Sequence, residues 1–66
     1  MNPKQIFEIR KSMGLSQNAF AVRLGVMFVT VNRWENGRQK PSPLALEKLL
    51  RVQAEEMRRK DRKPSN

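Results

Sequence analysis

The stretch that decides the fold runs from Gly14 to Gly37 and reads GLSQNAFAVRLGVMFVTVNRWENG. It predicts two short helices joined by a tight turn at Gly25, because a glycine lets the chain reverse where two helices approach closely. Ser16 is a suitable cap for the first of these helices, and Asn36 with Gly37 is typical of the turn that ends the second, which begins near residue 27. The apolar positions expected to face inward are Phe20, Ala21, Leu24, Val26, Val31 and Trp34. The outer face of the first helix, with the polar residues Gln17, Asn18 and Arg23, is expected to face water.

A further helix is predicted before this stretch. Asn2, Pro3 and Gln5 have the spacing of a capping box with proline at the first helical position, so the helix starts there and runs to about Met13. Its apolar stripe is Ile6, Ile9 and Met13, widened by Phe7. Gly14 then supplies the positive φ that ends it.

A long fourth helix is predicted after the stretch, because Ser42 and Pro43 are typical of a helix start and no Gly or Pro follows before Lys60. Its apolar stripe is Leu46, Leu50, Ala54 and Met57, joined by Leu49. We expect part of this stripe to complete the core and part to pair with a second copy of the chain. Charge pairs four residues apart should support the helix, namely Glu47 with Arg51, Arg51 with Glu55, Glu55 with Arg59, and Glu56 with Lys60. We divide the chain into a domain at 1–57 and a basic, frayed tail at 58–66.

Size and composition narrow the class of protein. A chain of 66 residues can hold one small core and no separate catalytic domain, so we do not expect an enzyme. Fourteen Lys and Arg against six Asp and Glu give a net charge of +8, which favours a polyanionic partner. The chain has no Cys and no His, so disulfides and the usual zinc sites are excluded, and no metal or other cofactor is expected. No signal peptide and no membrane-length apolar run is present, so we expect no membrane association and a place in the cytoplasm, on the nucleoid.

Several short motifs fall at consistent spacing and carry a resemblance. They are Leu15–Gln17, Leu24–Val26, Arg33–Gly37, Pro41–Ser42 and Arg10. Over roughly Ile6 to Leu50 the chain closely resembles the Cro/C1-type helix-turn-helix family, which contains the lambdoid phage repressors. The resemblance implies an all-α, lambda-repressor-like domain of four helices, here with a long C-terminal fourth helix. It also implies a transcriptional regulator, acting as a repressor, that binds double-stranded DNA as a homodimer and reads an operator with its third helix.

The resemblance further implies roles for single residues. The residue matching Gln17 lies against the DNA backbone and a base edge, and Ser16, Asn36, Arg38 and Lys40 match positions where phosphates pass. Such contacts position the protein and carry little sequence information. For Arg38 and Lys40, a solvated basic loop remains the alternative.

Arg10 and Glu35 match a family pair in which a partly buried ion pair ties the first helix to the end of the recognition helix. Its role would be orientation, because a buried pair need not add net stability. Two independent surface charges are the alternative.

The third helix departs from the family pattern, in which Ser, Thr, Gln or Arg usually occupy the positions of Met27, Phe28 and Val29. At about 100° per residue, the side opposite the core presents Val29, Asn32, Arg33 and Asn36, with Phe28 on its flank. Arg33 is the best candidate for reading a base, since its guanidinium can donate two hydrogen bonds to O6 and N7 of one guanine. Asn32 is suited to adenine or a phosphate, and Phe28 and Val29 to thymine methyl groups or sugars.

Two other functions stay open. The apolar Phe28 is alternatively folded over the core or part of a protein contact, and the chain would then be an antitoxin-like or adaptor protein. Its partner, such as a toxin, would bind the long fourth helix or the Phe28/Val29 surface. Generic RNA binding is disfavoured, because Phe7, Phe20 and Trp34 are better explained as core residues than as stacking aromatics.

Overall fold

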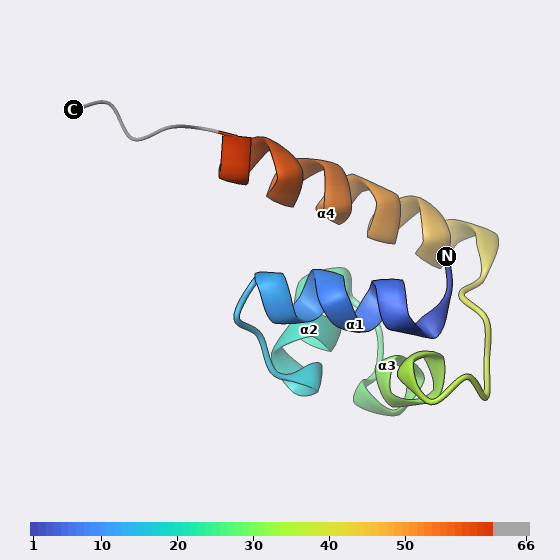
Figure 1. The fold of residues 1–66 in the computed structure, drawn as a ribbon. Helices are drawn as coiled ribbons and strands as arrows, with labels where there is room; N and C mark the ends of the chain where they lie inside the picture. Colours follow the sequence, from blue (N-terminus) through green and yellow to red (C-terminus); the bar gives the residue numbers. More distant parts are fainter. Residues whose placement is uncertain (62–66) are drawn as a thin grey trace.

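The computed structural model describes residues 1–61, and this part of the chain forms four α-helices and no strand. They are α1 (Pro3–Ser12), α2 (Gln17–Leu24), α3 (Phe28–Glu35) and α4 (Pro43–Asp61). In Figure 1, α4 crosses one side of the domain and α3 lies on the other. Both α1 and α2 contact α3 and α4, so these two helices form the middle of the domain. The predicted all-α fold with a long fourth helix is confirmed.

Side chains fix where the first two helices begin. The Asn2 side chain accepts a hydrogen bond from the Gln5 backbone N–H at 2.8 Å, and the Gln5 side chain accepts one from the Asn2 N–H at 2.9 Å. This is the predicted capping box. Ser16 caps α2 by accepting from the Ala19 N–H at 3.0 Å. By contrast, α3 has no side-chain cap, because Met27, the residue at its N-cap position, has no side-chain oxygen.

Gly25 makes the turn between α2 and α3. Its φ of 72° lies in the left-handed region, which only glycine adopts without strain. The Val26 N–H reaches back to the Ala21 carbonyl at 3.0 Å and closes the end of α2. The turn therefore brings α3 across α2, as the sequence predicts.

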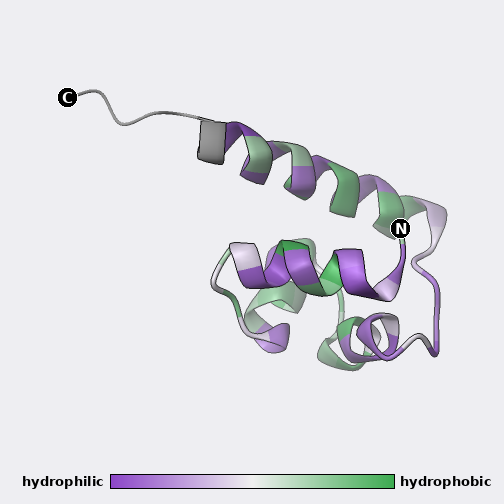
Figure 2. Ribbon diagram, in the orientation of Figure 1, coloured by the Kyte–Doolittle hydropathy of each residue, from purple (hydrophilic) through white to green (hydrophobic). Residues whose placement is uncertain are grey.

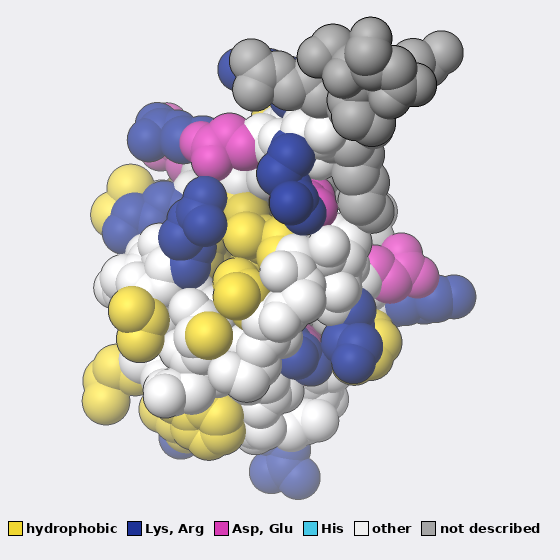
Figure 3. Space-filling view, turned by 90° about the vertical axis from the view of Figure 1, so that its left-hand side faces the viewer, with side chains coloured by type: hydrophobic (Ala, Val, Ile, Leu, Met, Phe, Trp, Pro, Cys, Tyr) yellow, Lys and Arg dark blue, Asp and Glu magenta, His cyan; other side chains and the backbone are white. Residues whose placement is uncertain are grey.

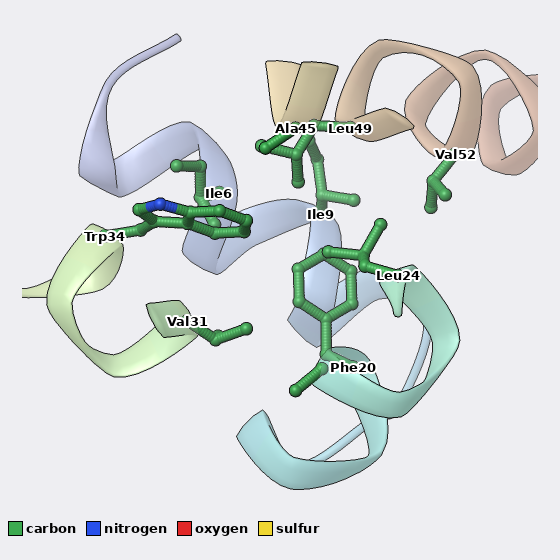
Figure 4. Close-up of a cluster of buried hydrophobic side chains, with 10 residues drawn as sticks. Ile6, Ile9, Phe20, Leu24, Val31, Trp34, Ala45, Leu49 and Val52 are labelled. Atoms are coloured by element: carbon green, nitrogen blue, oxygen red, sulfur yellow. The ribbon is translucent and has the colours of Figure 1, made fainter. Parts of the chain in front are cut away.

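One apolar cluster holds the four helices together, as Figure 4 shows. Its buried members are Ile6, Ile9, Phe20, Ala21, Leu24, Val31, Trp34, Ala45, Leu49 and Val52. The Trp34 ring lies beside Ile6 and is almost wholly buried, yet its indole N–H has no hydrogen-bond partner within the described residues. The ring is therefore held by apolar packing alone.

The predicted apolar stripe of α4 is only in part the inner face of the helix, because Leu49 is buried as predicted while Leu50 and Met57 are not. Ala45, Leu49 and Val52 face the core, whereas Leu50 is 49% and Met57 61% exposed. Leu46 is half-buried and Ala54 exposed. Figure 2 shows that hydrophobic and hydrophilic residues alternate along α4. Its apolar residues fall into two neighbouring stripes, a buried one with Ala45, Leu49 and Val52 and a more exposed one with Leu50 and Met57. Periodicity cannot choose between such stripes, because the choice depends on how α4 packs against α1 and α2.

The predicted charge ladder along α4 is also wrong in the described residues. Glu55 pairs with Arg23 of α2 at 3.5 Å, and Glu56 pairs with Arg59, three residues on, at 2.8 Å. The predicted partner of Glu56, Lys60, has a side chain outside the described part of the structure. α4 crosses the boundary that we predicted between residues 57 and 58 and ends at Asp61, and residues 62–66 lie outside the described residues.

Phe7 is a third correction, since it is exposed and does not widen the core. Its ring lies against the Arg10 guanidinium, whose central carbon is 5.2 Å from the ring centroid. A cation over an aromatic face is a favourable contact even near the surface. Phe7 therefore covers a charged group at the surface. Because it is not a core residue, it no longer supports the expectation that the aromatic residues are too buried to stack on RNA bases.

Candidate nucleic-acid interface

The candidate recognition surface is the outward side of α3. Val31 and Trp34 fix the opposite side of the helix in the core, and α3 packs on α1 and α2. The outward side carries Arg33, which is exposed, and Val29, which is 39% exposed. Figure 1 shows α3 at the edge of the domain away from α4, so no other helix covers this side.

An ion pair ties α1 to the end of α3. Arg10 donates to both carboxylate oxygens of Glu35, from Nε at 2.7 Å and from Nη2 at 2.9 Å. The two side chains are only 11% and 6% exposed. Arg10 Nη1 also donates to the Leu15 carbonyl at 2.9 Å. The hydrogen bonds and charge of Glu35 raise the pKa of the Arg10 guanidinium against the opposing effect of burial.

The ion pair continues into a chain of side-chain amides. Gln17 Nε2 donates to Glu35 Oε1 at 3.2 Å, and Gln17 Oε1 accepts from Asn32 Nδ2 at 3.1 Å. Asn32 Oδ1 in turn accepts from Asn36 Nδ2 at 3.0 Å. We call Arg10, Glu35, Gln17, Asn32 and Asn36 the polar network. It joins three helices, and it runs from the part-buried ion pair out to the exposed surface of α3.

The sequence alone does not reveal this network. Its pattern places Gln17 on the wet face of α2, whereas the side chain is half-buried and bonded to α3. Asn32 and Asn36 stand four residues apart on one helix, a spacing at which amide side chains can hydrogen-bond. That spacing was the available signal, but the link through Gln17 depends on the crossing of α2 and α3.

The network limits what its amides have left to offer a ligand. Gln17 and Asn32 each use one N–H and accept one hydrogen bond on the oxygen, which leaves each a single further donor and acceptor site. Arg33, in contrast, makes no side-chain hydrogen bond or ion pair within the described residues. Its side chain is exposed, so all its donors remain available to a ligand.

The residues predicted to meet phosphates all lie exposed. Ser16 precedes α2, and its hydroxyl oxygen already accepts the capping hydrogen bond, which leaves its proton free to donate. Asn36 ends α3, and Arg38 and Lys40 follow in the connection to α4. These positions belong to the segments that flank the helix pair, where a backbone contact would have to be made.

Basic side chains are not confined to one surface. On the face drawn in Figure 3, Lys and Arg side chains are spread from α4 to the opposite edge, with apolar side chains exposed between them. The net charge of +8 therefore attracts a polyanion generally and does not by itself locate the binding surface. No cluster of three or more metal-ligating residues occurs among residues 1–61, and none of the described helices is long and apolar enough to cross a membrane.

The comparison with known proteins agrees with this geometry. A family model described as helix-turn-helix matches residues 6–52, which include all of α2 and α3 and most of α1. No curated protein and no solved structure matches the chain.

Proposed function

The chain belongs to the Cro/C1-type helix-turn-helix family of DNA-binding transcription regulators, and we propose that it is a repressor that reads an operator with α3. The proposed partner is double-stranded DNA, and the proposed place of action is the nucleoid in the cytoplasm. Repression needs only that the bound domain occupies the operator, so the proposal requires no cofactor and no catalytic residue.

The free guanidinium of Arg33 carries this proposal. Val31 and Trp34 hold α3 from behind, so a helix lying in the major groove would present Arg33 to the base edges. A guanidinium matches the two acceptors of guanine, O6 and N7, and this is the commonest specific contact in protein–DNA complexes. Asn32 would contribute less, since its amide is already shared with Gln17 and Asn36.

The polar network supports the proposal as a positioning device. Gln17 lies at the first turn of α2, where helix N–H groups favour a phosphate, and Glu35 holds it through its amide. Ser16, Arg38 and Lys40 would add backbone contacts that set the register of α3 on the duplex. Arg10 and Glu35 would hold Gln17 in place from the part-buried end of the network, without contacting a base.

We also propose that the regulator binds as a homodimer. Leu50 and Met57 are large apolar residues of α4 that are exposed. Both belong to the apolar stripe of which part is expected to pair with a second copy of the chain. A two-fold dimer on a pseudo-palindrome would read half-sites about 34 to 36 Å apart, one helical turn of DNA.

Selection of bound sequences from a random duplex pool tests the function. We expect an enriched pseudo-palindromic motif with a guanine in each half-site. Retention that depends on salt but enriches no sequence would contradict operator reading and leave only attraction by charge. Arg51→Ala, which removes an exposed arginine from α4, is the matched control and should return the same motif as the unchanged chain.

An antitoxin-like or adaptor function is the second candidate. It is favoured by the same exposure of Leu50 and Met57, since large apolar side chains at a surface often mark a protein contact. This candidate predicts that the selection fails while the chain co-purifies stoichiometrically with one protein. It also predicts that Leu50→Asp abolishes this co-purification.

A further inference from the structure

The start of α3 is apolar where a DNA-reading helix is usually polar. Met27, Phe28 and Val29 follow one another there, and Phe28 is 51% and Val29 39% exposed. We call these three residues the apolar start of α3. None of their side chains can offer a strong hydrogen bond, so whatever they contact must itself present an apolar group.

Val29 and Arg33 share one side of α3. They are four residues apart and therefore about one helical turn apart, on the side opposite Val31 and Trp34. An approach that brings Arg33 to a base edge must bring Val29 to the neighbouring bases. Val29 is therefore part of the same contact surface as Arg33, and Phe28 lies next to it on the flank of the helix.

The nearby polar groups cannot easily take over the reading at this end of the helix. Asn32 lies one turn after Phe28, and its amide is already bonded to Gln17 and to Asn36. Its remaining N–H and acceptor site can meet a base only in the orientation that these two bonds fix, because turning the amide would break the bond that links α2 to α3. The exposed apolar side chain beside Arg33 is consequently that of Val29, with Phe28 next to it on the flank of the helix.

The major groove offers one apolar group to such side chains, the C5-methyl group of thymine. We infer that Phe28 and Val29 read a pyrimidine C5-methyl group next to the guanine read by Arg33, whichever base carries that methyl group. The inference rests on the proposed function and names the chemistry of the operator. Since cytosine methylated at C5 presents the same group, it should replace thymine at this position.

This kind of reading differs from hydrogen bonding in a measurable way. Thymine and 5-methylcytosine share the methyl group but differ at position 4, where thymine has an acceptor oxygen and cytosine a donor amine. An apolar reader responds to the methyl group and ignores position 4. A hydrogen-bonding reader does the reverse.

The test uses the operator obtained by the selection above, with single thymines replaced in synthetic duplexes. Replacement by deoxyuridine removes one methyl group and should weaken binding about fourfold at one or two positions of each half-site. Replacement of the T·A pair by C·G should weaken binding at least as much. Replacing that cytosine by 5-methylcytosine should then strengthen binding again, by about fourfold. Equal binding of thymine and deoxyuridine duplexes at every position would overturn the inference.

Variants assign the effect to its side chains. Phe28→Ala and Val29→Ala should each bring the ratio of thymine to deoxyuridine affinities toward one at a single position, and both chains should keep the unfolding temperature because the residues are exposed. Leu44→Ala, a change of another exposed apolar residue that lies outside the proposed contact surfaces, should leave the ratio unchanged. If no variant alters the ratio, the methyl groups are read elsewhere and the assignment to α3 is wrong.

The two proposals fail in different ways. A random pool that yields no enriched sequence overturns operator reading and this inference with it. An enriched motif that is bound equally well with thymine or deoxyuridine overturns only the inference.

Discussion

Removing either partner of the Arg10–Glu35 pair should strongly destabilise the fold, and removing both should cost much less than the sum. Glu35→Ala takes the carboxylate from the Arg10 guanidinium, whose side chain is only 11% exposed, and leaves it the Leu15 carbonyl as a hydrogen-bond acceptor and the Phe7 ring as a neighbour. It also takes an acceptor from the Gln17 amide. Arg10→Ala leaves a carboxylate only 6% exposed, with a single amide donor.

Breaking a buried ion pair from one side typically costs about 3 to 5 kcal/mol. A domain of 66 residues has a total stability of about 3 to 10 kcal/mol, so each single change removes a large part of it. In the double variant neither charge is left buried without a partner. The coupling between the two sites should therefore be about 1 to 3 kcal/mol, a value typical of residues in one network.

Urea unfolding measures this directly, because Trp34 is the single tryptophan of the chain and its burial makes its fluorescence a reporter of the core. All four chains of the cycle should be compared in the same concentration of a stabilising osmolyte, so that the weaker ones begin folded. The matched control is the Arg23–Glu55 pair, which is about half-exposed, and whose coupling should not exceed about 1 kcal/mol. Strict additivity of Arg10→Ala and Glu35→Ala would refute the reasoning.

Four further outcomes are expected. Arg33→Ala should weaken the best operator by about 1 to 3 kcal/mol and relax the preference at one guanine, and an unchanged sequence profile would remove Arg33 from the base readers. Lys40→Ala should weaken all duplexes alike and flatten the dependence of log affinity on log salt by about one unit, which titration at several salt concentrations measures. Leu49→Ala should cost about 2 to 5 kcal/mol of stability by leaving a cavity, while Leu50→Ala should stay within about 0.5 kcal/mol, and similar losses at both would contradict the observed register of α4. Leu50→Lys combined with Met57→Lys should give a folded monomer in sedimentation, and a dimer that persists would place the interface elsewhere.

The sequence was sufficient to predict the helices, because the residues at which a helix begins and ends depend on local chemistry. The Asn2 and Ser16 caps and the glycines at 14 and 25 each act within a few residues, so their patterns predict the ends of α1 and α2 closely. The face of α4 was not predictable in the same way. Leu49 and Leu50 are equally apolar neighbours, and only the packing against α1 and α2 decides which of them is buried.

In the candidate site, too, the features that depend on the packing of helices could not be predicted from local sequence. Arg10 and Glu35 could be paired in advance only through the family resemblance, since 25 residues separate them and no local spacing joins them. The further links through Gln17 and Asn32 depend on the angle at which α2 and α3 cross. Phe7 was misjudged because an aromatic residue near an apolar stripe is usually core, whereas here it packs on the Arg10 guanidinium at the surface.

The polar network also bears on how such a protein could diverge. Gln17, Asn32 and Glu35 hold three helices together, so a change at any of them disturbs the framework. Phe28 and Arg33 make no side-chain hydrogen bond within the described residues and can be exchanged without loss of the fold. Duplicated copies of this gene could therefore acquire new target sequences through changes at a few exposed positions, while the scaffold that presents them stays the same.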